Sequence, residues 1–373
     1  MRVLIITGEL SGDLYASLLV KKIRELNPSF HFLGIGGPKL RGSDAEILFS
    51  AEALSLVGIP KPSDLKKYLF IYRKVEDILR KRKVDLVILV DFPGFNLKIA
   101  KLAKSLNYPV VYYVAPQIWA WYKNRIKILK SCVDLLFVVL PFEEEFFKNY
   151  GIPVKYYGHP LVDIVKVNQS KELFFTIYGL EENKTLISFF PGSREGEVAR
   201  HLPLFIKVYR KFKKRRPDCV GILGKAQGLK DSPLWEEAKR DMLVLENMPY
   251  EILKYSHVAL LASGTITLEA ALLETPAVVT YNLPSWMYLI AKKLVKVPYI
   301  SLPNLILGKE VYPEILQNKQ SPEALVVALE EMLRKGEEIK RELQNIRALL
   351  GKPGVTWKIA EEIIKFAQTL KKY

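Results

Sequence analysis

Asp91 is the residue of this sequence whose type and position best suit acid–base chemistry. It follows the apolar, β-branched run Asp85–Val90 and begins the segment DFPGFN. A carboxylate at the carboxyl end of a buried strand can take a proton from a substrate hydroxyl. The alternative is a cap for the helix that follows, for which Asn96 is the better candidate. We therefore predict that Asp91 is a general base.

Two later segments are suited to binding a diphosphate. An arginine comes directly after the turn sequence PGS, and a guanidinium group binds phosphate through two N–H groups at any physiological pH. The sequence SGTITLE follows the apolar run Val258–Ala262, and the hydroxyl and N–H groups at its helix start can hold phosphate. A glutamate one helical turn later is within reach of a ribose diol. The alternatives are a surface arginine and an ordinary capped helix. The residues predicted at this diphosphate site are Arg194, Ser263, Gly264, Thr265 and Glu269.

The loop after the first apolar run is a candidate site for a second substrate. Its sequence GELSGD places small residues between a strand and a helix, where backbone N–H groups can bind an anion or a sugar hydroxyl. A glycine turn with a purely structural role is the alternative. Aromatic residues between Tyr112 and Tyr122 could line a substrate pocket or stack on bases. The residues predicted on this second side are Ser11, Gly12, Asp13 and Trp119.

Alternating strands and helices position these loops, which indicates the α/β class. Short, continuous apolar runs predict strands, and the amphipathic segments between them predict helices; this alternation is typical of parallel sheets. The pattern begins again near residue 186, so we predict two doubly wound, Rossmann-like domains facing a central cleft. The predicted domains are residues 1–168 and 169–354, with a helix over 355–373 that crosses back to the first domain. Within them, Gly158–Gly179 is predicted to contain the linker and Ala238–Val244 a strand.

The segment Leu65–Leu79 has the pattern of a basic amphipathic helix. Its apolar residues recur at helical spacing between lysines and arginines. This combination favours an anionic membrane surface, with about 1 kcal/mol of attraction per basic residue. The alternative is a buried helix whose lysine stems lie along apolar surface. The residues predicted to contact a membrane are Leu65, Leu69, Phe70 and Tyr72.

Composition narrows the class of protein. Of 373 residues, 49% are hydrophobic and 26% charged, which excludes a disordered or fibrous chain. The 56 lysines and arginines exceed the 40 acidic residues by 16, which favours a polyanionic partner. The two cysteines, Cys132 and Cys219, provide neither a metal site nor a disulfide framework. No signal peptide or membrane span is expected, so we predict a cytoplasmic protein that contacts a membrane from its surface.

Nine short motifs, taken in order, resemble those of the lipid-A-disaccharide synthase family. These enzymes are inverting glycosyltransferases of the GT-B fold, in glycosyltransferase family 19. Each motif is weak alone, but nine in order over nearly the whole chain are specific. The motifs are Gly8–Asp13, Gly34–Pro38, Asp91–Asn96, Tyr113–Trp121, Gly158–Leu161, Pro191–Arg194, Ser263–Glu269, Leu302–Asn304 and Pro313–Leu316.

The resemblance implies a reaction and a place in the cell. UDP-2,3-diacylglucosamine would give its sugar to 2,3-diacylglucosamine 1-phosphate (lipid X), forming the β-1′,6-linked lipid A disaccharide 1-phosphate and UDP. The family works in lipopolysaccharide synthesis at the cytoplasmic face of the inner membrane of Gram-negative bacteria, as a peripheral membrane protein. Residues 1–168 would then be the acceptor-binding, membrane-facing domain, and residues 169–354 the UDP-sugar donor-binding domain.

The resemblance also implies roles for single residues. Asp91 would take the proton of the acceptor 6-hydroxyl, Arg194 would stabilise the departing UDP, and Asn304 of the LPN motif would be a third catalytic residue. Gly94 stands where the family often has a second aspartate, so a two-carboxylate role is not implied. Because the sequence contains no DxD-like carboxylate pair for Mg²⁺, we expect no cofactor and metal-independent catalysis.

Two other interpretations stay open on the sequence. Another GT-B enzyme that acts on UDP-N-acetylglucosamine, such as the 2-epimerase or the peptidoglycan transferase, would share the fold. A basic, non-catalytic protein that binds membranes or nucleic acid would explain the charge but give no use to Asp91, Arg194 or Glu269. We therefore expect the two acylated sugars and an anionic inner-membrane surface as partners, and no nucleic acid. The sequence indicates neither the oligomeric state nor the preferred acyl-chain length.

Overall fold

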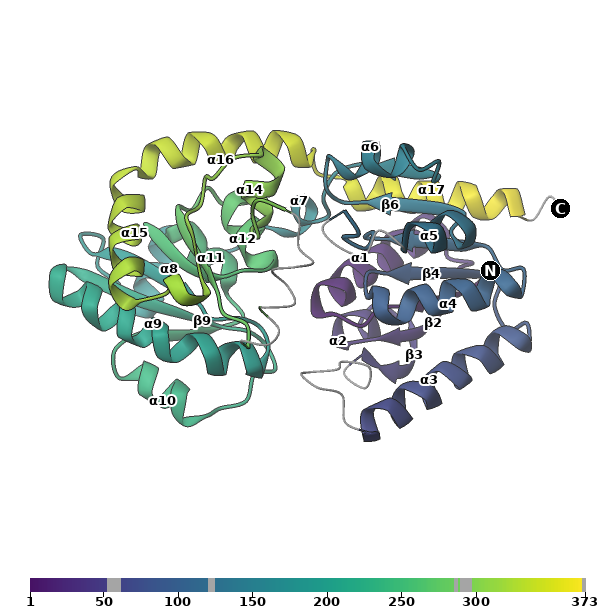
Figure 1. Ribbon diagram of the computed structural model, residues 1–373, viewed down its shortest axis with the longest axis horizontal. Coiled ribbons are helices and arrows are strands. Elements are labelled where there is room, and N and C mark those ends of the chain that lie inside the picture. The colour runs from purple at the N-terminus through teal and green to yellow at the C-terminus, as the bar shows by residue number, and fades with distance from the viewer. Residues whose placement is uncertain (52–61, 120–124, 285–287, 289–296, 371–373) are drawn as a thin grey trace. The chain divides into compact units, whose positions relative to one another are not determined.

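The chain folds into two compact units, each with its own parallel sheet (Figure 1). The computed structural model describes residues 1–51, 62–119, 125–284, 288 and 297–370. Unit 1 consists of Met1–Asp163 and Leu350–Tyr373, and unit 2 consists of Ile164–Leu349. The α/β class predicted from the sequence is confirmed. Trp121 and Tyr122 of the predicted aromatic cluster lie outside the described residues.

The sheet of unit 1 has seven parallel strands in the order β3-β2-β1-β4-β5-β6-β7. The central strands, such as the fully buried LVILV of β4, are apolar throughout because helices cover both faces of a parallel sheet. The strand order reverses between β1 and β4, which is where open α/β sheets bind ligands. The strands are β1 (Arg2–Ile6), β2 (His31–Gly36), β3 (Glu46–Ser50), β4 (Leu86–Val90), β5 (Val110–Tyr113), β6 (Leu135–Val138) and β7 (Val154–Tyr156).

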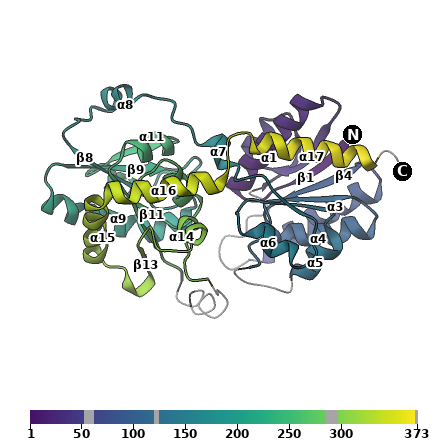
Figure 2. The ribbon, with the colours of Figure 1, turned by 90° about the horizontal axis from the view of Figure 1, so that it is seen from above.

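The helices of unit 1 come mostly from its first 163 residues, but the last one comes from the C-terminal segment. α17 (Val355–Leu370) packs along α1 (Leu10–Leu26), as Figure 2 shows. The carboxylate of Asp163 accepts hydrogen bonds from the N–H groups of Gly354 (2.5 Å) and Thr356 (2.8 Å), which fixes the start of α17. The other helices are α2 (Pro38–Arg41), α3 (Pro62–Arg80), α4 (Pro93–Ser105), α5 (Ile126–Cys132), α6 (Glu143–Lys148) and, at the boundary to unit 2, α7 (Leu161–Ile164).

The sheet of unit 2 has six parallel strands in the order β10-β9-β8-β11-β12-β13, with the reversal between β8 and β11. The strands are β8 (Thr185–Phe190), β9 (Cys219–Lys225), β10 (Leu243–Glu246), β11 (Val258–Ala262), β12 (Ala277–Tyr281) and β13 (Glu314–Leu316). The helices are α8 (Lys171–Tyr178), α9 (Glu195–Arg215), α10 (Pro233–Lys239), α11 (Pro249–Tyr255), α12 (Thr265–Leu272), α14 (Leu302–Leu307), the 3-10 helix η3 (Gln317–Lys319), α15 (Pro322–Arg334) and α16 (Gly336–Leu350).

The fold differs from the sequence prediction at several elements. The edge strands β3 and β13 were missed, because both are only partly buried and their apolar runs, Ile47–Phe49 and Ile315–Leu316, are short. The strand predicted over Ala238–Val244 is wrong, since α10 continues to Lys239 and β10 begins at Leu243. The predicted linker Gly158–Gly179 contains α7 and α8. Among the residues that the structure describes, every helix is too short or too polar to cross a bilayer.

Candidate active site

Asp91 lies directly after β4 in a strained backbone conformation. Asp91 and Phe92 have φ angles of 48° and 49°, in the left-handed region. This conformation costs a residue with a side chain about 1–2 kcal/mol, and such strain concentrates at functional sites. Asp91 is partly exposed. It does not cap α4, because Phe92 occupies the N-cap position and Asn96 lies within the helix without capping it.

The loop GELSGD lies against Asp91 and Phe92, and two of its glycines make this contact possible. A Cβ atom on Gly8 would lie 2.5 Å from the ring of Phe92. A Cβ atom on Gly12 would lie 2.5 Å from Oγ1 of Thr7 and 3.7 Å from Cβ of Asp91. The structure therefore brings the first loop and the candidate base together at the carboxyl ends of β1 and β4. Ser11, at the start of α1, is partly exposed there.

Asp13, by contrast, belongs to the interior of unit 1. Its carboxylate is 2% exposed and accepts N–H groups from Gly37 (2.6 Å), Lys39 (2.9 Å) and Leu40 (3.2 Å). These bonds cap α2 and join the GELSGD and GIGGP motifs. The Asp13 carboxylate therefore supports the fold of unit 1, and its contact with an acceptor stays a prediction.

Trp119 is held by a buried glutamate that sequence reasoning missed. Nε1 of Trp119 donates to Oε1 of Glu143 (2.9 Å), and the N–H groups of Val139 (3.2 Å) and Leu140 (3.0 Å) donate to Oε2. Burial raises the pKa of Glu143 to about 7, the charge of nearby Asp91 adds to this rise, and the three hydrogen bonds oppose it. The acidic run EEEFFK predicts a helix start but does not show which glutamate is enclosed.

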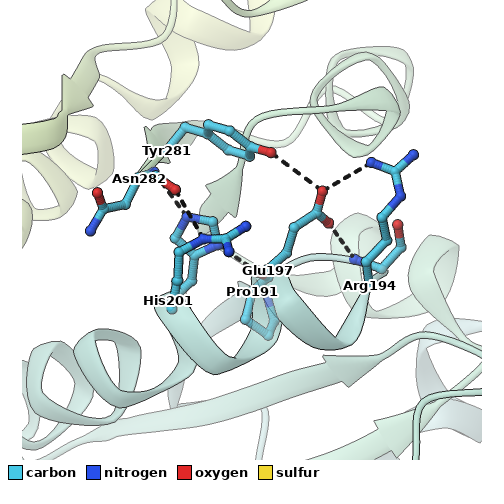
Figure 3. Close-up of polar contacts among 8 residues, drawn as sticks. Pro191, Arg194, Glu197, His201, Tyr281 and Asn282 are labelled. Atoms are coloured by element: carbon cyan, nitrogen blue, oxygen red, sulfur yellow. Dashed lines mark hydrogen bonds and ion pairs between the residues drawn. The ribbon is translucent and has the colours of Figure 1, made fainter. Parts of the chain in front are cut away.

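Arg194 is the N-cap of α9 and forms an ion pair with a second missed glutamate, Glu197 (Figure 3). Oε1 of Glu197 lies 3.3 Å from Nη1 of Arg194 and accepts the hydroxyl of Tyr281 at 3.3 Å. Its Oε2 accepts the N–H of Ser193 at 3.1 Å. Gly192 has a φ of +128°, and a Cβ atom there would lie 2.6 Å from Cβ of Glu197. Glu197 therefore fixes the PGSR turn and its arginine to the end of β12.

His201, on α9, bonds to the same turn at Pro191 (Figure 3). This fully buried imidazole bonds through Nδ1 to the carbonyl of Pro191 (2.9 Å) and accepts the N–H of Asn282 at Nε2 (3.0 Å). The second bond requires an unprotonated Nε2, so Nδ1 is the donor. Burial lowers the pKa of His201, in agreement with a neutral ring. The imidazole of His201 thus connects the ends of β8 and β12, next to the turn that carries Arg194.

The start of α12 combines an exposed glycine with N–H groups that no side chain caps. Gly264 has a φ of 159° and is the N-cap, and among the described residues no atom lies within 4 Å of its Cβ position and no side chain caps the helix. Ser263 and Thr265 beside it are partly exposed. One turn on, burial raises the pKa of Glu269 to about 7, and a long hydrogen bond of 3.4 Å from the hydroxyl of Tyr250 opposes this. A diphosphate and a diol fit these groups.

Asn304 has a supporting position in the fold of unit 2. It is fully buried, and Nδ2 donates to the carbonyl of Tyr312 (2.7 Å) and to Glu314 (2.9 Å), while Oδ1 accepts from Val311 and Tyr312 (2.9 Å each). Its amide is thus saturated. Glu314 in turn accepts the N–H groups of Ile300 and Ser301. Asn304 therefore supports the fold of unit 2 through its amide group, and its catalytic role stays a prediction.

The helix α3 presents apolar side chains on two faces. Tyr68, Ile71, Val75 and Leu79 are buried in the core, whereas Leu65 (57%), Leu69 (46%) and Phe70 (54%) are exposed. Tyr72 is partly buried, and its ring lies nearly perpendicular to that of Phe95, with the ring centroids 6.4 Å apart. Three of the four predicted membrane residues therefore lie on the exposed face of α3.

The structure thus gathers two sets of groups, one in each unit. In unit 1, Asp91, Gly12 and Ser11 meet at the ends of β1 and β4, and in unit 2 Arg194 and the Ser263–Glu269 segment follow β8 and β11. In both units these are the strands between which the order reverses. Among the described residues, no group of three or more His, Cys, Asp or Glu side chains is arranged to hold a metal ion.

Comparison with known proteins identifies close sequence relatives. A family model described as "Lipid-A-disaccharide synthetase" matches residues 3–362. The lipid-A-disaccharide synthase of Trichlorobacter lovleyi is 35% identical over 376 residues, which cover 98% of each chain. That of Syntrophus aciditrophicus is 35% identical over 378 residues, covering 99% of this chain and 98% of the relative.

Solved structures show the same fold at low sequence identity. The UDP-GlcNAc 2-epimerase of Neisseria meningitidis, determined with UDP-GlcNAc bound, superposes with a TM-score of 0.68 at 13% identity, covering 98% of this chain and all of the other. The MurG protein of Acinetobacter baumannii superposes with a TM-score of 0.56 at 14% identity, covering 98% and 99%. Both are GT-B enzymes, so the predicted GT-B fold is confirmed.

Proposed function

The chain belongs to the lipid-A-disaccharide synthase family, and on this premise we propose which of its residues carry out the reaction. The enzyme is a glycosyltransferase of lipid A biosynthesis, and the substrates of its family are UDP-2,3-diacylglucosamine and 2,3-diacylglucosamine 1-phosphate. The acceptor 6-hydroxyl oxygen bonds to the anomeric carbon while the bond from that carbon to the diphosphate breaks. The hydroxyl must lose a proton, and UDP must take up negative charge.

Asp91 is the proposed base that removes this proton. It lies at the carboxyl end of β4, beside the strand-order reversal, in a left-handed backbone conformation that the chain maintains despite its cost. The neighbouring carboxyl group, Glu143, is enclosed by three N–H donors, whereas Asp91 is partly exposed and can meet a hydroxyl group. The observation that carries the proposal is that Asp91 combines a strained backbone with a partly exposed carboxylate.

Arg194 and the start of α12 are proposed to stabilise the leaving UDP. A guanidinium group can bind both phosphates, and the N–H groups at Gly264 and Thr265, which no side chain of the described residues caps, add the partial positive charge of a helix start. Donors that are already in place can be worth a few kcal/mol to a transition state in which charge develops. With this arrangement the reaction needs no metal ion. Glu269 is proposed to accept the ribose hydroxyls of the donor.

The exposed face of α3 is proposed to contact the membrane that contains the lipid substrates. Leu65, Leu69 and Phe70 are each about half exposed on a helix that also carries Lys66, Lys67, Arg73 and Lys74. Apolar side chains flanked by cations bind anionic bilayers through burial and charge together. We propose on this basis that the enzyme acts as a peripheral protein at the cytoplasmic face of the inner membrane. No part of the proposal involves nucleic acid.

Replacement of Asp91 by asparagine tests the proposal. We expect Asp91→Asn to lower kcat by about 10²-fold or more with little change in UDP affinity, since general-base catalysis typically contributes 10²–10⁴-fold. Asp85→Asn is the matched control, because Asp85 precedes the same strand and is exposed, and its Oδ2 accepts the N–H of Arg2 (2.7 Å). Product formation from the two diacylated sugars is the readout. A near-native kcat for Asp91→Asn would overturn the assignment.

A further inference from the structure

The peptide carbonyl of Asp91 accepts hydrogen bonds from two buried side chains. The hydroxyl of Tyr112, on β5, donates to this oxygen at 2.7 Å, and Nδ2 of Asn96, on α4, donates to it at 2.7 Å. The N–H of the same residue donates to the carbonyl of Tyr113 at 2.9 Å. Asn96 and Tyr112 are both fully buried. The backbone of Asp91 is thus tied to two neighbouring elements by three hydrogen bonds.

These bonds oppose a backbone that would otherwise relax. Two consecutive residues with side chains, Asp91 and Phe92, adopt positive φ angles, which persist only where the surrounding structure over-determines them. The carbonyl is the group whose direction would change if Asp91 returned to an extended conformation. Because Tyr112 and Asn96 both hold that carbonyl, they oppose the rotation that would also move the carboxylate.

Asn96 connects this carbonyl to the neighbouring strand ends. Its Nδ2 also approaches the carbonyls of Ile6 (3.3 Å) and Val90 (3.2 Å), the last residues of β1 and β4. Its Oδ1 has no hydrogen-bond partner among the described residues. Burying an unpaired amide oxygen is unfavourable, so the N–H groups are what this side chain contributes. Asparagine is therefore present here as a donor to strand ends, in place of the helix cap that its sequence position suggested.

We propose that Tyr112 and Asn96 are positioning residues that hold the Asp91 carboxylate in place for proton transfer. The proposal rests on the proposed role of Asp91 as the base. Burial, together with the neighbouring charge of Asp91, raises the pKa of Tyr112 well above its usual value, so its hydroxyl remains a donor throughout the working pH range. Neither residue is expected to touch a substrate, because both are fully buried.

The chain offers a matched pair of tyrosines for the test. Tyr112→Phe removes the hydroxyl that binds the Asp91 carbonyl. Tyr113→Phe removes the same atom from the next residue of β5, which is equally buried but whose hydroxyl has no partner within the described chain. We expect Tyr112→Phe to lower kcat about tenfold, as for the loss of one hydrogen bond, with both KM values within twofold of wild type. Tyr113→Phe should match wild type. Equal kcat values for the two variants would overturn the proposal.

A double-mutant cycle separates positioning from a general loss of structure. If Tyr112 acts through Asp91, Tyr112→Phe should cause no further loss of kcat in the Asp91→Asn background. A further tenfold loss there would show that the hydroxyl supports the fold instead. Asn96→Leu, which keeps the volume and removes both donors, should behave in the same way; if it does not fold, the tyrosine pair still decides. Failure of the base assignment is seen separately, as near-native turnover of Asp91→Asn alone.

Discussion

Replacing Glu269 by glutamine tests whether its carboxyl group is reserved for a ligand. Burial raises the pKa of Glu269 to about 7, and the hydrogen bond from Tyr250, at 3.4 Å, is long and compensates little. A buried carboxylate destabilises the fold when it is ionised. Hydrogen bonds from the hydroxyl groups of a bound ribose would reduce this cost. We therefore expect Glu269→Gln to stabilise unit 2 and to weaken UDP binding.

The size of the stability effect follows from the pKa. Between the usual value of 4.5 and about 7, folded Glu269 retains a proton that the unfolded chain has lost. The folded state binds more protons, so stability falls as pH rises through this window. At 1.36 kcal/mol per pKa unit, the loss is at most about 3 kcal/mol at pH 8. Glutamine carries no charge and avoids this loss, so Glu269→Gln should raise the Tm of unit 2 at pH 8, by at most about 6–12 °C, and leave it unchanged at pH 4.

UDP binding should show the reciprocal effect. Hydroxyl groups that donate to the ionised carboxylate lower its pKa, so binding releases a proton and strengthens as pH rises from 5.5 to 8. The affinity for UDP rises about tenfold for each unit by which binding lowers the pKa of Glu269. Phosphate groups of UDP also titrate near pH 6. The quantity to compare is therefore the ratio of the Glu269→Gln and wild-type Kd values at each pH, measured by titration calorimetry.

Two results would show that Glu269 has a different role. Equal Tm values for wild type and Glu269→Gln at pH 8 would show that the carboxyl group is not held in unfavourable surroundings. A ratio of Kd values that does not change between pH 5.5 and 8 would show that Glu269 does not bind UDP. Glu236→Gln is the control, since Glu236 on α10 is exposed and paired with Lys239, and it should change neither quantity.

Two further predictions concern the leaving group and the membrane. Arg194→Ala should weaken UDP binding and lower kcat together, and EDTA should leave wild-type activity intact; activity lost in EDTA and restored by Mg²⁺ would assign the leaving-group charge to a metal. Leu69→Ser with Phe70→Ser should release the protein from anionic vesicles, most completely at high salt, without changing UDP affinity. The control pair Leu173→Ser with Ile177→Ser, on exposed positions of α8, should sediment with vesicles as wild type does; release by the control pair alone would place the contact elsewhere.

Elements with strong local patterns could be predicted from the sequence. The continuous apolar runs of β4 and β11 are typical of strands covered on both faces, and both strands form as expected. Asp91 could be predicted as a candidate base for the same reason, because a residue directly after such a strand lies at the end of the sheet. Edge strand β3 had no such pattern, since strands at an edge are only partly buried. Its position depends on pairing with β2, which a local pattern does not contain.

The roles of buried polar residues could not be predicted, because their partners come from distant parts of the chain. Asp13 binds N–H groups of residues 37–40, and Asn304 binds the segment 311–314. Both look like site residues in a motif, although both support the fold. Glu143 and Glu197, by contrast, were not predicted as site residues, although they contact Trp119 and Arg194. They lie among other charged residues of helix starts, and only the structure shows which of them contacts a site residue.

Identification of the product by mass spectrometry tests whether this protein joins the two acylated sugars. Purified protein is incubated with UDP-2,3-diacylglucosamine and 2,3-diacylglucosamine 1-phosphate, in parallel with the Asp91→Asn and Asp85→Asn variants. We predict the β-1′,6-linked disaccharide 1-phosphate and an equal amount of UDP from wild type and Asp85→Asn, and at most about a hundredth of that initial rate from Asp91→Asn. Absence of the disaccharide with wild type, or epimerisation of soluble UDP-N-acetylglucosamine in its place, would contradict the account.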